Sequence, residues 1–233
     1  METAFDFNEK FGTPKKLLCK NFNKIQISIH PDFSGIYLCY QEAFKSLKAD
    51  LSILTSYPEI RVWKDPNRSG YTIANAWQWH LYWSKNTPKN INLLVHSFPQ
   101  DEDKIELLKK EASLEFMRFL ASYHHDLDRM NPAKMQSLIN AHISYEVILA
   151  LNKENSFKPH RTMSLDLLAK LLSFTRNQLN YRNKVINRQR QKIFDQLQQT
   201  SGIVQQLLNN VDFVLTPDQL PTHLSQKYAQ CSS

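Results

Sequence analysis

The chain has 233 residues, enough to bury a core in one domain or in two small ones. Its 42% hydrophobic and 22% charged residues are typical of a folded protein and exclude a disordered one. Three scattered cysteines exclude a cysteine-based zinc site and a disulfide framework, and the four glycines form no phosphate-binding loop. We therefore expect neither a metal nor another cofactor. The 29 Lys and Arg exceed the 22 Asp and Glu, which gives a formal net charge of +7.

The N-terminal segment, METAFDFNEKFGTPKK, places acidic residues ahead of its lysines and has no apolar centre. It therefore lacks the features of a secretory signal. No run approaches the roughly 18 apolar residues that a membrane span needs. These observations predict a cytoplasmic protein that has no membrane partner.

In chain order, the first hundred residues predict a mixed α/β arrangement. Residues 24–30 alternate with period two and end at Pro31, which indicates a half-buried strand. Residues 34–57 carry apolar side chains three or four positions apart, which predicts a helix. Two further strands are expected at 59–63 and 90–98.

An aromatic cluster lies between these last two strands and contains all four tryptophans of the chain. Its spacing around residues 77–83 fits a strand that buries one face. We favour an aromatic core, while a stacking platform for bases remains the alternative because such a platform needs exposed ring faces. The members of the cluster are Trp63, Tyr71, Trp77, Trp79, Tyr82 and Trp83.

Helices are expected from Pro99 onward. The acidic residues 101–103 suit the positive end of a helix dipole, and the helix that they open should continue to Tyr123. Asn131 and Pro132 are typical of a helix cap and of a first helical residue. We expect the helix that they begin to run to about residue 151.

A polar segment at residues 153–163 contains Pro159 and predicts a linker. It would separate a mixed α/β domain, residues 1–152, from a helical basic domain, residues 164–233. The expected fold class is therefore α+β, with a small mixed sheet and helices in the N-terminal half and an all-helical C-terminal half.

The beginning of the second domain has clear local signals. Ser164 is a suitable cap for a short helix, and a turn is expected near Ser173. A long helix should then run from about Thr175 to Thr200, followed by helices at 203–215 and after Thr216.

Residues 167–194 hold seven basic side chains and no acidic one. Subtracting these seven from the 29 basic residues leaves 22 against 22 acidic residues, so this basic segment accounts for the whole net charge. Lys and Arg neutralise phosphates and release their counterions, which favours a polyanion as the partner. The seven are Lys170, Arg176, Arg182, Lys184, Arg188, Arg190 and Lys192.

On a helix, Leu179, Ile186 and Ile193 fall in one narrow stripe, and Lys184, Arg188 and Lys192 fall on the opposite side. We expect the three cations to be exposed, because burying unpaired charges is costly. Amide side chains that can pair with base edges are interleaved with the cations. These are Asn177, Asn180, Asn183, Asn187 and Gln191.

Residues 165–179 resemble a helix-turn-helix. Ala169 is the small residue at the helix crossing, Ser173 stands where the turn usually has glycine, Thr175 suits the second cap and Leu179 the apolar anchor. Arg182 departs from the pattern, since a second apolar anchor is usual there. The resemblance implies that a recognition helix begins with Arg176, Asn177, Gln178, Asn180 and Tyr181.

Two short patterns are similar to enzyme sites. His125 and Asp126 form an adjacent pair that resembles the HD-type metal hydrolases, although no distant Asp completes the ligand set. The spacing of Arg118 and His124 is similar to that of the helical RNases of the HEPN class, in which such a pair stabilises a phosphorane and moves a proton.

We therefore expect a non-catalytic protein that binds nucleic acid, DNA more than RNA, as a regulator, a replication or mobile-element accessory factor or a subunit of a nucleoprotein complex. One alternative is a protein-interaction subunit or homodimer that docks through the long amphipathic helix. Another is a nuclease or metal-dependent phosphohydrolase. The expected binding residues are Lys170, Arg176, Asn177, Gln178, Asn180, Arg182, Lys184, Arg188, Arg190 and Lys192.

Overall fold

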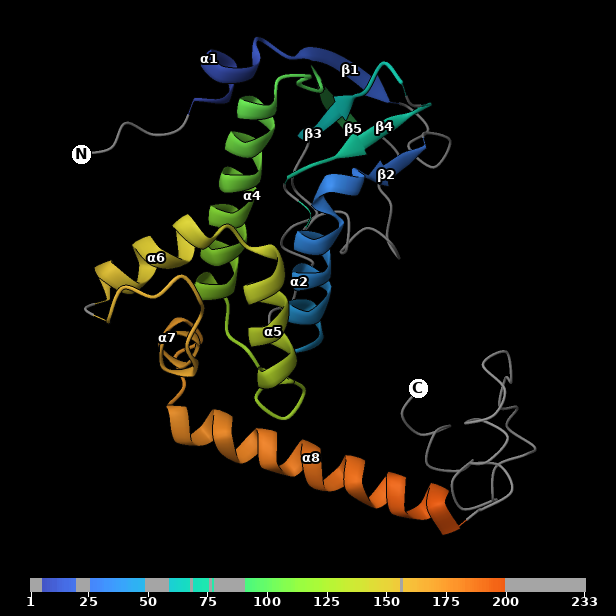
Figure 1. The fold of residues 1–233 in the computed structure, drawn as a ribbon. Coiled ribbons are helices and arrows are strands. Elements are labelled where there is room, and N and C mark those ends of the chain that lie inside the picture. The colour runs from blue at the N-terminus through green and yellow to red at the C-terminus, as the bar shows by residue number, and fades with distance from the viewer. Residues whose placement is uncertain are drawn as a thin grey trace. The chain divides into compact units, whose positions relative to one another are not determined.

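The computed structural model shows a mixed α+β protein in which a five-stranded sheet is joined to a group of helices (Figure 1). By compactness, the chain divides into one unit of residues 1–183 and a second of residues 184–233. The first unit contains the sheet and the helical group. The described residues are 6–19, 26–48, 59–67, 69–75, 77, 91–155 and 157–199.

The sheet has the strand order β1-β5-β3-β4-β2 and is mixed. β5 runs parallel to β3 and antiparallel to β1, while β4 runs antiparallel to β3 and parallel to β2. The strands predicted at 59–63 and 90–98 are confirmed. Of the strand expected over 24–30, the structure shows Ile27–Ile29 as β2, and residues 24 and 25 lie outside the described residues. The bounds are β1 Lys15–Cys19, β2 Ile27–Ile29, β3 Glu59–Lys64, β4 Tyr71–Ile73 and β5 Ile91–Ser97.

The described part of the aromatic cluster belongs to the core. The side chains of Trp63 and Trp77 are fully buried. The indole of Trp63 donates a hydrogen bond to Asn75 Oδ1 at 3.1 Å, and Trp77 packs edge-on against Tyr40. The core interpretation is thus confirmed for these two tryptophans. Trp79, Tyr82 and Trp83 lie outside the described residues, as does most of the strand expected there.

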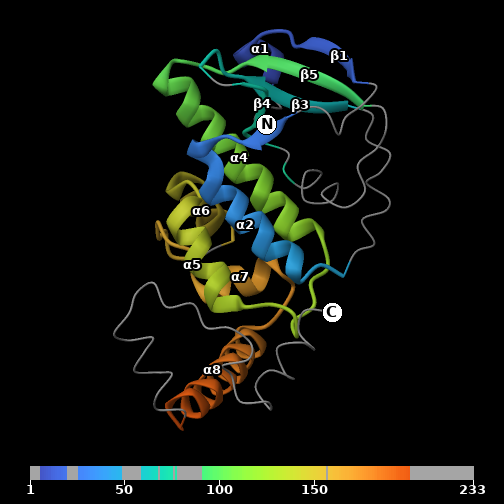
Figure 2. The same ribbon diagram turned by 90° about the vertical axis from the view of Figure 1, so that its right-hand side faces the viewer.

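Two helices, α2 (Ser34–Lys45) and α4 (Glu102–Ser122), lie side by side next to the sheet (Figures 1 and 2). The ring of Tyr40 on α2 is 5.0 Å from the ring of Phe116 on α4. α4 begins as predicted, because the Asp101 side chain accepts a hydrogen bond from the Asp103 amide. α2 ends at Lys45, where its cap, Ser46, hydrogen-bonds to His125 just after α4, and residues 49–57 of the predicted helix lie outside the described residues.

The helix expected from Asn131 to residue 151 is two helices, α5 (Pro132–His142) and α6 (Tyr145–Glu154). Asn131 caps α5 as predicted, but the chain becomes extended at Ile143. Ile143 is buried there, and the Ser144 amide donates to Ser113 Oγ on α4 at 3.1 Å. These tertiary contacts stabilise a break that the apolar periodicity does not reveal.

The segment predicted as a linker forms hydrogen bonds with the helical group. The Asn152 side chain donates to the His160 carbonyl at 2.9 Å, and the Met163 amide donates to Asn140 Oδ1 at 2.6 Å. Met163 is also buried in the hydrophobic core. The division between the compact units falls after Asn183. None of the helices in the described part of the chain has the length and apolar composition of a membrane span.

Glu42 links α2 to α5 and makes stability depend on pH. Its buried carboxylate lies 2.9 Å from Lys45 Nζ and 3.1 Å from Lys134 Nζ. Burial alone would raise the pKa of Glu42, but the two ammonium groups outweigh burial and lower it. A carboxylate with a lowered folded pKa stabilises the protein above its unfolded pKa of about 4.3 and loses this contribution as the pH falls through the folded pKa.

We therefore predict that Glu42→Gln lowers the free energy of unfolding by about 1 to 2 kcal/mol at pH 7. The difference from the parent should shrink as the pH falls below about 4. Urea denaturation across this pH range measures it, with the exposed Glu154→Gln as the control. A loss that is equal at pH 7 and pH 3 would contradict the assignment.

Candidate nucleic-acid interface

The short helix α7 (Leu165–Leu171) begins at Ser164, whose side chain accepts a hydrogen bond from the Leu167 amide at 3.1 Å. One side of α7 is buried in the helical core. The cap at Ser164 is confirmed, and it sets the starting point of the basic segment. The buried residues are Leu167, Leu168 and Ala169.

The turn after α7 is built around Ser173, which has a φ of 57° and is the one non-glycine residue with positive φ in the described part of the chain. The Phe174 amide donates to the Ala169 carbonyl at 2.8 Å, and the Ser173 amide donates to the Lys170 carbonyl at 3.2 Å. These two bonds form the Schellman arrangement, in which glycine is the usual left-handed residue. The predicted tight turn is therefore confirmed, with serine in the glycine position.

A capping box opens the next helix, α8 (Arg176–Gln199). Thr175 Oγ1 accepts from the Gln178 amide at 3.2 Å, while the Thr175 amide donates to Gln178 Oε1 at 2.8 Å. This reciprocal pair satisfies two amides at the helix start. Gln178, expected from the sequence to contact bases, therefore has its side-chain oxygen engaged in the cap. The Thr-x-x-Gln spacing was a signal in the sequence for this role.

The first two turns of α8 are anchored to the rest of the first unit. Leu179 is fully buried. The Arg182 guanidinium donates to the Met130 carbonyl at 3.1 Å and also to the Asp128 carbonyl. Asn183 Oδ1 accepts from the Ala133 amide at 3.0 Å. Arg182 thus occupies the second anchor position with hydrogen bonds in place of apolar packing, a role that depends on residues about fifty positions away.

A continuous row of exposed side chains runs along the opposite side of α8. We call it the exposed stripe, and it lies within about 60° around the helix axis on each side of Tyr181. The predicted exposure of its three cations is confirmed. Among the described residues, no carboxylate forms an ion pair with any of the three. The exposed residues within these limits, which form the stripe, are Asn177, Gln178, Tyr181, Lys184, Arg188, Lys192 and Asp195.

The other expected binding residues lie away from the exposed stripe. Arg176 is exposed and pairs with Asp166 of α7 at 3.3 Å. Lys170 is exposed on α7, with its ammonium 5.9 Å from the Phe157 ring centroid. Asn180 is half-buried. Arg190 is exposed but lies only about 20° around the axis from Leu179, on the apolar side of α8.

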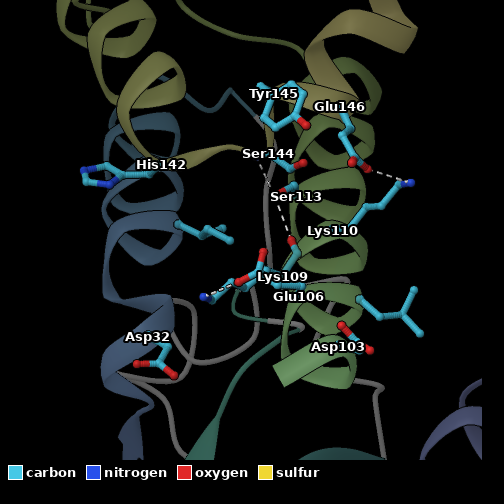
Figure 3. A pocket seen from close by; sticks show the side chains of 12 residues that line it. Asp32, Asp103, Glu106, Lys109, Lys110, Ser113, His142, Ser144, Tyr145 and Glu146 are labelled. Carbon is cyan, nitrogen blue, oxygen red and sulfur yellow. Dashed lines mark hydrogen bonds and ion pairs between the residues drawn. The ribbon is translucent and has the colours of Figure 1, made fainter. Parts of the chain in front are cut away.

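A cavity of about 450 Å³ lies between α2, α4 and the start of α6 (Figure 3). Lys110 on its wall pairs with Glu146 at 3.0 Å. Ser113 Oγ donates to the Lys109 carbonyl at 2.8 Å, and Figure 3 shows the His142 imidazole pointing away from Ser113. The cavity therefore brings no imidazole base to the Ser113 hydroxyl.

His125, the imidazole of the possible metal-hydrolase pair, has both ring nitrogens engaged. Nδ1 lies 2.9 Å from Ser46 Oγ, and Nε2 lies 3.1 Å from the Leu120 carbonyl. Burial lowers the pKa of His125, which favours the neutral ring. Asp126 pairs with Arg129 at 3.6 Å. In the part of the chain that the structure describes, no three His, Cys, Asp or Glu side chains gather as metal ligands do.

Arg118 and His124, the pair with the ribonuclease-like spacing, are both exposed. Comparisons of the chain with models of protein families, with curated proteins and with solved structures find no match. The functional argument therefore rests on the geometry of α7, the turn and α8.

The left-handed conformation of Ser173 leads to a stability prediction. Glycine carries no Cβ penalty at this φ, so Ser173→Gly should raise the free energy of unfolding by about 0.5 to 1 kcal/mol. Ser173→Val should lower it by about 1 to 2 kcal/mol, because a β-branched side chain is strained there. Urea denaturation of both variants measures the effect, and a neutral valine variant would contradict the turn geometry.

The two hydrogen bonds of Arg182 lead to a second prediction. Arg182→Met keeps much of the stem but removes both bonds to the carbonyls of Asp128 and Met130, so the free energy of unfolding should fall by about 1 to 3 kcal/mol. The matched control is Arg188→Met on the exposed stripe, which should change stability by less than about 0.5 kcal/mol. Equal effects in the two variants would show that Arg182 is not an anchor.

Proposed function

We propose that this protein binds nucleic acid, double-stranded DNA before RNA, through the exposed stripe of α8. The observation that carries the proposal is the accessibility of Lys184, Arg188 and Lys192, which form no ion pair with a described carboxylate. Cations held in a row on a helix can neutralise successive phosphates and release their counterions. The location of the whole net charge in this segment supports the same partner.

The local structure before the stripe supports a helix-turn-helix. α7 is followed by a tight turn at Ser173 and by a second helix with a capping box. In that motif the first residues of the second helix approach base edges in the major groove. Arg176 and Asn177 are exposed at this position, as the motif requires.

The positions along α8 suggest a division of roles. Asn177 lies at the start of the helix, and its amide can form the paired hydrogen bonds that recognise adenine. Lys184 and Arg188 follow later in the sequence of α8, and their exposed cations suit phosphate contacts. Gln178 is a weaker base reader than Asn177, because its side-chain oxygen accepts hydrogen bonds from Thr175.

The function proposed is therefore binding without catalysis. A DNA-binding regulator, a replication or mobile-element accessory factor and a subunit of a nucleoprotein complex all need such a surface. The second candidate is docking of a protein partner on the apolar stripe of α8. It is favoured by Ile193, whose residue surface is 38% exposed on that side of the helix.

The decisive variant is Lys184→Ala combined with Arg188→Ala. We predict weaker binding to all DNA sequences by about the same factor, because phosphate contacts carry no sequence information. The slope of log affinity against log salt should flatten by about one unit for each lost contact. Gel shifts with double-stranded DNA, single-stranded DNA and RNA at two salt concentrations measure both effects.

The matched control is Lys153→Ala combined with Lys158→Ala, which removes the same charge from exposed positions outside α8. It should bind almost as the parent does. If both double variants bind equally well at moderate salt, the exposed stripe is only a solvated surface. Binding of a protein that is abolished by Ile193→Glu but not by the Lys184 and Arg188 replacements would favour the docking candidate.

A further inference from the structure

Tyr181 belongs to the exposed stripe, four residues after Asn177 in the sequence. It is 66% exposed, more than any other large hydrophobic residue in the described part of the chain. Around the helix axis it lies about 40° from Asn177, so the two side chains leave α8 on the same side. An exposed aromatic ring next to an amide suits a partner surface that has both polar and apolar groups.

The major groove of DNA offers such a surface where a thymine stands, because its C5-methyl group is apolar and lies beside the hydrogen-bonding edges of the bases. We infer that Tyr181 packs its ring on a thymine methyl group while Asn177 contacts an adjacent adenine. The site then selects A·T steps of double-stranded DNA. This inference rests on the proposed function and names the substrate of the same site.

The spacing of the two residues agrees with neighbouring base pairs. Four residues of a helix rise about 6 Å along its axis. Successive base pairs are about 3.4 Å apart. Asn177 and Tyr181 can therefore meet base pairs one or two steps apart.

A duplex fits the stripe better than unpaired bases. Proteins that bind single strands stack successive bases on several aromatic side chains. In sequence, α8 has only two aromatic residues, Tyr181 and Phe194. Double-stranded RNA is also disfavoured, because its deep and narrow major groove does not admit side chains and its uracil lacks the methyl group.

The test compares duplexes that differ only in the methyl group. The probes are alternating adenine–thymine, adenine–deoxyuracil and guanine–cytosine DNA duplexes of equal length, titrated with the full chain at one moderate salt concentration. We expect the parent to bind the thymine duplex about fourfold more tightly than the deoxyuracil duplex for each methyl contacted. The guanine–cytosine duplex should bind more weakly than the thymine duplex.

The variants assign the preference to the ring. Tyr181→Ala should bind the thymine and deoxyuracil duplexes equally, whereas Tyr181→Phe should keep the preference because it keeps the ring. Tyr145→Ala is the matched control, since Tyr145 is an exposed tyrosine outside α8 and its loss should leave the preference unchanged. Circular dichroism checks that each variant is folded.

The outcomes separate this inference from the proposed function. Duplex binding by the parent with no difference between thymine and deoxyuracil would overturn the role of Tyr181 and leave the proposed function standing. Tyr181-dependent binding of single-stranded oligo(dT) that is as tight as duplex binding would also overturn it, in favour of stacking on unpaired bases. If the parent binds none of the probes, both the role of Tyr181 and the proposed function are wrong.

Discussion

The start of α8 is the constraint on which the proposed binding surface depends. Three local devices define it: the left-handed turn at Ser173, the reciprocal cap between Thr175 and Gln178, and the Arg182 hydrogen bonds to two backbone carbonyls. The cap satisfies amides that would otherwise lack partners at the helix start, and the carbonyl contacts fix the rotation of the helix about its own axis. Because rotation decides which side chains face water, these contacts place Tyr181 on the exposed side.

The basic residues of the segment therefore divide into two physical roles. Arg182 has a structural role, because its guanidinium donates to the Met130 carbonyl, and Arg176 forms an ion pair with Asp166. Lys184, Arg188 and Lys192 form no ion pair with a described carboxylate. A count of charges alone treats these residues as equivalent, whereas the structure shows which cations have partners and which are accessible. The nucleic-acid proposal uses the accessible cations of the second group as its main observation.

The sequence predicted those parts of the fold whose causes are local. The caps at Asn131 and Ser164, the start of α4 at the acidic residues 101–103, the two long strands and the turn at Ser173 all follow from short patterns. The break at Ile143 was not predictable in this way, because it depends on a contact with Ser113 thirty-one residues away. The anchoring role of Arg182 was missed for the same reason. In the candidate site, the exposure of the cations was predictable from helical periodicity, while their partners were not.

The most direct test of the central claim is to map, by backbone amide chemical shifts, where a short DNA duplex contacts the full chain. The account predicts that the largest shifts fall at Asn177, Tyr181, Lys184 and Arg188 and that they diminish as salt is added. Shifts confined to the apolar side of α8 around Ile186 and Ile193, or to the sheet, would contradict it. So would a spectrum that does not change when the duplex is added at low salt.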